Sequence, residues 1–330
     1  MRTPIRSDQL KWRAFAFFGP VLLLVFAPQA QAETQRFNGL CDISAAASLG
    51  DGTLIAASDE ENKLFTFSVQ AGAPIAIFDL NNPLDLAFGS SEIDIEAAAI
   101  GADRIWWIGS HQAFKPNRQM VFATNIPAPS LHDLTIEVPP FNLTQALQSS
   151  EQLAEVLHPL TFVEDPKNGG LNIEAAALTP QGHLMIGLRS PLAGTDGVNG
   201  PAILIKLNLT PSVSVIDVAL LDLSNRGLRG MTALDTGFLI IAGASTGVGH
   251  SELFHWIPGQ TPIAVSGQNI ANLNPETLVS LPNGLLVLSD DSSAIRHSHD
   301  GGFEKCKTLQ RNENPDDTGA IFTQGLLLPR

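Results

Sequence analysis

The chain has 330 residues, of which 44% are hydrophobic, and a formal net charge of −14 at pH 7. This length allows one or two domains with a sizeable core. An acidic surface repels phosphate backbones, so nucleic acid is excluded as an expected partner, whereas cations are attracted.

The first 32 residues have the pattern of an export signal. Four basic residues within positions 2–13 precede an apolar run over 14–27, and Ala30-Gln31-Ala32 fits the small-x-small cleavage rule. We expect a Sec-type signal peptide cleaved after Ala32, and a mature domain of residues 33–330 in the periplasm or outside the cell. The alternative is a membrane anchor, but this run is shorter than the ~20 residues of a span, and no later stretch is long and apolar enough.

One short motif recurs five times and organises the chain. Asp94-Ile95-Glu96-Ala97 returns almost unchanged as Asn172-Ile173-Glu174-Ala175, and looser copies occur elsewhere. Aligned on one position, the five copies are marked by Ser44, Glu96, Glu174, Arg229 and Glu276. Each copy continues into a turn signal and a short apolar run, which predicts a hairpin of buried strands. Most intervals are close to the 40–50 residues of a propeller blade.

Two further strands are expected after most hairpins, which gives four strands per unit. They are expected at 63–69 and 74–80, 119–125 and 134–138, 201–207 and 213–221, and 251–257 and 261–265. The last copy offers only 303–308 and 320–328, and residues 35–40 from the other end of the chain can complete its sheet. The sequence therefore predicts an all-β fold, a single β-propeller of five four-stranded blades, or six if another blade lies within 115–171.

The long interval between the second and third copies indicates an insertion. Asn142 and Gln145 resemble a capping box, and apolar residues follow at roughly helical spacing, so one short helix is predicted near 142–158. Two interpretations remain open for it: an excursion on the surface, or a lid over the site.

The hairpins place a candidate site at one end of the ring. Fifteen residues after each aligned position stand Asp59, His111, Arg189, Ala244 and Asp291. A chain that runs up one strand and back down the next returns to the same end of the sheet, so both columns are expected on one face near the axis. The ligand-binding candidates are Glu96, Glu174, Glu276, Arg189, Arg229, His111, Asp59 and Asp291, with Asp94, Asn172, Asn274 and Asp290 beside them.

These residue types suggest three kinds of function. Glu96, Glu174 and Glu276 form a tentative metal set suited to Ca²⁺, the two arginines suit a carboxylate or phosphate, and His111 is the candidate acid–base group. The first hypothesis is binding of a small anionic ligand or a divalent cation at one end of the central channel. The alternatives are metal-assisted hydrolysis of phosphoesters or other esters, and an interaction scaffold in which the charges only lock blades together. The sequence does not decide whether the protein is an enzyme.

The two cysteines, Cys41 and Cys306, stand near opposite ends of the mature chain. A closed ring brings those ends together, and export permits oxidation, so a disulfide is expected, with two free buried thiols as the alternative.

Together with Ile108-Gly109-Ser110-His111 and Leu288-Ser289-Asp290-Asp291, the repeated motifs resemble a bacterial family of exported, propeller-like proteins, the domain of unknown function family 3616. The resemblance extends over roughly residues 40–310 and implies no particular activity. Ala97 and Ala175 depart from it, since glycine is expected after the glutamate. More loosely, the repeats resemble the esterase-like phytase propellers, and phosphoester hydrolysis is implied only by that analogy.

Overall fold

A computed structural model describes residues 32–70, 72–86, 92–247, 249–268, 270–298, 301–312 and 319–329. The expected signal peptide lies outside these residues apart from Ala32, so it stays a prediction. From Ala32 onward the chain forms one compact unit. Within the described segments, no helix combines the length and the hydrophobicity that a membrane span requires.

Five antiparallel sheets of four strands form the blades. Blades I and II are β2 (Ala45–Gly50), β3 (Thr53–Ser58), β4 (Glu61–Ser68), β5 (Pro74–Asp79), and β6 (Ile95–Ile100), β7 (Arg104–Gly109), β8 (Val121–Asn125), β9 (Ile136–Phe141). Blades III and IV are β10 (Asn172–Leu178), β11 (Leu184–Ser190), β12 (Ala202–Asn208), β13 (Ser214–Leu221), and β14 (Gly227–Ala233), β15 (Phe238–Gly243), β16 (Glu252–Trp256), β17 (Ile263–Ala264). Blade V is β18 (Pro275–Leu281), β19 (Gly284–Ser289), β22 (Phe322–Pro329) and β1 (Glu33–Asn38).

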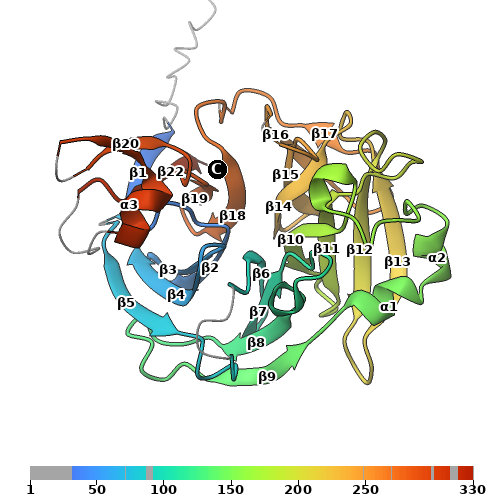
Figure 1. The fold of residues 1–330 in the computed structure, drawn as a ribbon, viewed down its shortest axis with the longest axis horizontal. Helices are drawn as coiled ribbons and strands as arrows, with labels where there is room; N and C mark the ends of the chain where they lie inside the picture. Colours follow the sequence, from blue (N-terminus) through green and yellow to red (C-terminus); the bar gives the residue numbers. More distant parts are fainter. Residues whose placement is uncertain are drawn as a thin grey trace, which may run out of the picture. The chain divides into compact units, whose positions relative to one another are not determined.

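The innermost strands β2, β6, β10, β14 and β18 each contact the next, and β18 contacts β2, so the ring closes (Figure 1). The predicted five-bladed propeller is confirmed. The sixth blade is not formed, because β8 and β9 complete blade II from within the segment proposed for it.

Small side chains on the inner strands allow the blades to meet at the axis. Ala46, Ala99, Ala176 and Ala233 are among the residues that line one half of the channel, where the remaining cavity is about 120 Å³. Gly230 shows how close this packing is: a Cβ there would lie 2.4 Å from the carbonyl oxygen of Glu276 in the next blade. Only glycine fits that approach.

Blade V contains strands from both ends of the described chain. Strand β1 pairs antiparallel with β22, with Arg36 opposite Gln324, as the sequence predicts. A disulfide joins Cys41 to Cys306, with their Cα atoms 5.6 Å apart, so the expected bridge is confirmed.

The segment around Cys306 differs from the expectation of one strand over 303–308. Residues Phe303–Lys305 form β21, which pairs with β20 (Ile295–His297) in a separate hairpin, and helix α3 begins at Cys306 and ends at Asn312. Cys306, Leu309 and Gln310 are its buried residues. Their spacing of three and four is that of one helix face packed against the core, which explains the helix.

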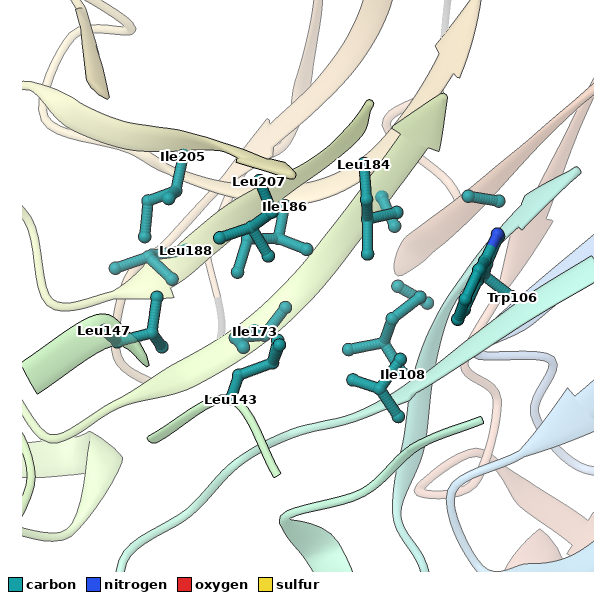
Figure 2. Close-up of a cluster of buried hydrophobic side chains, with 14 of the residues drawn as sticks. Trp106, Ile108, Leu143, Leu147, Ile173, Leu184, Ile186, Leu188, Ile205 and Leu207 are labelled. Atoms are coloured by element: carbon teal, nitrogen blue, oxygen red, sulfur yellow. The ribbon is translucent and has the colours of Figure 1, made fainter. Parts of the chain in front are cut away.

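The insertion holds two short helices instead of the single one predicted near 142–158. Helix α1 spans Thr144–Gln148 and α2 spans Glu151–Ala154, and the Ser150 hydroxyl caps the second by accepting from the Leu153 amide at 3.3 Å. Leu143 and Leu147 pack against Ile173 and Leu188 of blade III (Figure 2). The two helices therefore complete a hydrophobic core beside blades II and III. Two 3-10 turns, η1 (Pro116–Arg118) and η2 (Pro166–Asn168), flank them in the chain.

Candidate functional site

A β-bulge occurs at the same place in four of the five inner strands. The pairing of β6 with β7 shifts between Ile95 and Ala97, and equivalent shifts occur at the aligned positions of β10, β14 and β18. The extra residues are Glu96, Glu174, Arg229 and Glu276. A bulge redirects a side chain away from the regular alternation of a strand. In blade I the aligned Ser44 precedes β2 and has no bulge, and it donates instead to the Ile95 carbonyl at 2.6 Å.

Arg229 binds two of the three bulge glutamates. Its Nε lies 3.3 Å from Glu174 Oε2, and its Nη2 donates to Glu276 Oε1. Arg189 Nη1 lies 2.7 Å from Oε1, the other carboxylate oxygen of Glu174. Both arginines proposed as anion ligands are therefore engaged by glutamates, and Glu174 and Glu276 have their own protein counter-charge.

Glu96 is the exception among the bulge glutamates. Its side chain is 8% exposed, and within the described part of the chain it has no hydrogen bond and no ion pair. Carboxylate oxygens of Glu96, Asp59 and Asp94 lie within 4.8 Å of one another. Burial, together with the charges of Glu174 and Asp94, raises the pKa of Glu96 well above its usual range.

Asp94 is held so that one of its oxygens stays free. Arg118 Nη1 contacts Asp94 Oδ1 at 2.8 Å, and the same guanidinium binds Glu92. The other oxygen, Oδ2, is buried and has no hydrogen-bond partner among the described residues. Burial raises the pKa of Asp94 to about 6, although Arg118 opposes that shift.

Asp59 is the third carboxylate, and it touches a fourth. The Asp59 amide donates to Asp42 Oδ1 at 3.3 Å, and burial together with the charge of Asp42 raises the pKa of Asp59 well above its usual range. Burial raises the pKa of Asp42 to about 8, with Asp290 adding to the effect. Carboxylates from blades I, II and V thus converge with too few basic partners to neutralise them.

These groups surround a cavity of about 440 Å³ at this end of the channel. Seven acidic residues line it, against the four basic residues Arg118, Lys167, Arg189 and Arg311. No aromatic side chain contributes to the wall, and Pro166 is its one apolar residue within the described chain. Such a wall suits a charged or strongly polar occupant, and its net charge favours a cation.

Four of the eight sequence-predicted candidates do not line this cavity: Arg229 and Glu276, which pair with each other, and His111 and Asp291. His111 is buried, its Nδ1 lies 2.8 Å from the Gly109 carbonyl, and its Nε2 accepts from the Leu143 amide at 3.3 Å. Burial lowers the pKa of His111 to about 4, so the ring is neutral. Asp291 pairs with Arg296 at 3.0 Å. Neither residue lines the cavity, whereas Asp59, Glu96, Glu174 and Arg189 do.

Asp42, Arg118, Lys167 and Arg311 were not named from the sequence, and Asp94, Asn172 and Asn274 were named only beside the ligand-binding candidates. Asp42 and Asp94 share one signal, since each stands two residues before an aligned position, as Asn172 and Asn274 do. Side chains two apart on a strand point to the same face, so a third polar column was present in the sequence. Arg118, Lys167 and Arg311 stand outside the repeats, and no comparable spacing points to them.

The fold and this site together define a five-bladed β-propeller whose channel opens into an acidic cavity at one end. The profile of a family described as "Protein of unknown function (DUF3616)" matches residues 42–135. This match confirms the resemblance predicted from the sequence over that part of the chain, which includes Asp59, Asp94 and Glu96.

Solved structures of similar shape have low identity to this chain. Glutaminyl cyclase from Myxococcus xanthus is 10% identical with a TM-score of 0.44, over 78% of this chain and 90% of its own. A putative oxidoreductase (glucose dehydrogenase) from Thermus thermophilus is 9% identical with a TM-score of 0.44, over 90% of this chain and 100% of its own. A luciferin-regenerating enzyme is 7% identical with a TM-score of 0.44, over 90% of this chain and 96% of its own. No curated protein matches the chain. These likenesses carry no inference about what the chain binds.

Proposed function

We propose that this propeller binds a divalent cation, with calcium as the expected ion, through Asp59, Asp94 and Glu96 at the acidic end of its channel. The observation that carries the proposal is Glu96, a buried carboxylate with no hydrogen bond or ion pair among the described residues, close to two further carboxylates. A buried charge needs a partner or a proton, and a hard cation is a partner that three carboxylates suit.

This ligand set differs from the expected set of Glu96, Glu174 and Glu276. Glu174 and Glu276 contact Arg229, so a second cation beside them would meet a positive guanidinium. Glu96 forms no ion pair with a guanidinium among the described residues, and carboxylate oxygens of Glu96, Asp59 and Asp94 lie within 4.8 Å of one another. Because glutamates already engage both arginines, this end of the channel suits a cation better than a free anion.

The affinity expected for such a site is modest. Carboxylate sites in extracellular calcium-binding modules have Kd values of about 10⁻⁴ to 10⁻³ M. We infer export from the disulfide, which persists in oxidising compartments, and the test is that the amino terminus of the mature protein is Glu33.

Calorimetric titration and thermal shift with Ca²⁺, Mg²⁺ and Mn²⁺ test the cation. With calcium at 100 times its Kd, linkage stabilises the native state by about 2.7 kcal/mol, which raises the Tm by roughly 5 °C. Glu96→Gln should abolish the shift. Glu155→Gln removes an equal charge from the exposed end of α2 and should retain it. No heat and no shift with any ion would contradict the proposal and leave the scaffold hypothesis.

The alternative hypothesis, hydrolysis of an ester, is tested separately by measuring turnover. A carboxylate-held cation polarises a phosphoryl or carbonyl oxygen and activates water. Release of product from a panel of phosphoesters and carboxylic esters, dependent on calcium and lost in Glu96→Gln, would favour the hydrolase. Calcium binding without turnover would leave a binding protein.

A further inference from the structure

We propose that the cavity beside the cation takes a small anionic ligand, a phosphate or carboxylate group that coordinates the ion with one oxygen and contacts Lys167 with another. The inference rests on the proposed cation site and names the class of molecule that completes it. Lys167, which the repeats do not predict, is the residue that makes the assignment specific.

Coordination leaves positions open on the ion. Calcium takes six to eight oxygens, and Asp59, Asp94 and Glu96 are three carboxylates. The cavity of about 440 Å³ exceeds the space of a few waters, each about 30 Å³, and falls within the range of small-molecule sites. A wall without aromatic side chains disfavours an apolar ligand and favours one rich in oxygen.

Lys167 is the basic group of this wall whose side chain is uncommitted. Arg118 binds Glu92 and Asp94, Arg189 binds Glu174, and Arg311 binds Glu60. The Lys167 side chain has no hydrogen bond or ion pair among the described residues. An exposed ammonium group without a partner among the described residues, in the wall of the same cavity as the proposed cation site, is suited to an anion.

The turn that carries Lys167 is well defined. The Asp165 carboxylate accepts from the Lys167 amide at 2.9 Å, and the Gly170 carbonyl accepts from the Ser190 hydroxyl at 2.7 Å. A Cβ at Gly170 would lie 1.9 Å from the Glu164 carbonyl oxygen, so the chain passes too close there for any other residue. Ser245 and Thr246 of blade IV line the cavity as well, and their hydroxyl groups can donate to ligand oxygens.

The test titrates the purified protein with methylphosphonate and with acetate, each with and without saturating Ca²⁺. Methylphosphonate should bind only with calcium present, and each ligand should raise the affinity for the other by the same factor, because coupling is reciprocal. Acetate should show the same dependence if a carboxylate serves equally. Lys167→Gln should weaken methylphosphonate binding at least fivefold and leave calcium affinity within twofold. Lys305→Gln, on exposed β21 outside the cavity wall, is the matched control and should change neither.

The outcomes separate this inference from the function on which it rests. If calcium does not bind, both fail. If calcium binds and neither anion does, or if Lys167→Gln binds methylphosphonate as tightly as the unchanged protein, only the anion site is overturned. Binding of methylphosphonate without calcium, at unchanged affinity, would also overturn it, since the bridged geometry would then be wrong.

Discussion

Arg229 of blade IV and Glu276 of blade V form a buried ion pair across the boundary between their blades. The same guanidinium contacts Glu174 of blade III, so one side chain links three consecutive blades. Proximity to Glu276 and Glu174 outweighs burial and raises the pKa of Arg229. The arginine thus occupies the part of the channel where a second cation would otherwise be needed.

We expect Arg229→Gln to destabilise the fold by about 3–5 kcal/mol, because it leaves two buried glutamates without their counter-charge. Thermal unfolding measures this as a fall in Tm of roughly 5–9 °C. Arg226→Gln is the control in the same blade: its partner Glu252 is 39% exposed, and such a pair contributes at most about 1 kcal/mol. Adding Glu174→Gln and Glu276→Gln to Arg229→Gln should restore much of the loss. Equal effects of the two arginine substitutions would contradict the buried role of Arg229.

At Glu96, in contrast to Arg229, we expect a substitution to stabilise the fold. In EDTA at pH 7.5, Glu96→Gln should raise the Tm by a few degrees, since it removes a buried carboxylate that lacks a partner. A carboxyl group whose folded pKa is raised destabilises the fold as pH rises above its unfolded value of about 4.3. The gain should therefore shrink when the measurement is repeated at pH 4, where Glu96 is mostly protonated in both states. A variant that is less stable than the unchanged protein in EDTA at pH 7.5 would refute this.

Burial of His111 should make the free energy of unfolding fall as the pH is lowered. Its folded pKa of about 4 lies below the unfolded value, so its contribution to stability is complete above about pH 6.5 and is lost as pH falls toward 4. That shift corresponds to about 3 kcal/mol. His111→Gln should reduce the loss of unfolding free energy between pH 7 and pH 4 by this order. The control is His132→Gln at an exposed position, which should leave the slope unchanged. Equal slopes for all three proteins would show that His111 does not titrate as its burial implies.

Removal of the disulfide should lower stability substantially. The bridge joins residues 265 apart in sequence, and the chain-entropy estimate for so long a loop is an upper figure of about 5 kcal/mol. Cys41→Ser with Cys306→Ser should lower the midpoint of urea unfolding, and reduction of the unchanged protein should match it. Two thiols that react in the denatured, unreduced protein would show that the bridge does not form.

The ring was predictable because its signal is periodic. Five copies at blade spacing, each with a fifteen-residue return, predict that Glu96 and Arg189 lie at the same end of the channel, and both line the cavity there. The choice of partners was not predictable in this way. Arg229 and Glu276 meet because a bulge turns each side chain, and a bulge leaves no mark in an alternation of apolar residues.

The positions of His111 and Lys167 relative to the cavity also could not be predicted from the sequence. His111 stands in the same column as Arg189, but the insertion brings the Leu143 amide against its ring and closes it off from the cavity. Lys167 reaches the cavity because the same insertion ends in a turn beside it. Neither outcome follows from local spacing, since both depend on how a non-repeated segment packs against the ring.

Pairing of β1 with β22 also imposes an order on assembly. A ribosome makes the chain from its amino terminus, so β1 is synthesised first, and its partner appears almost 300 residues later. Blades I to IV use only consecutive strands and can form as they emerge, whereas blade V must wait for the whole chain. Contacts between such distant residues slow folding. The last step in forming the ring is then the pairing of β1 with β22. A chain that ends before Phe322 lacks the strand with which β1 pairs.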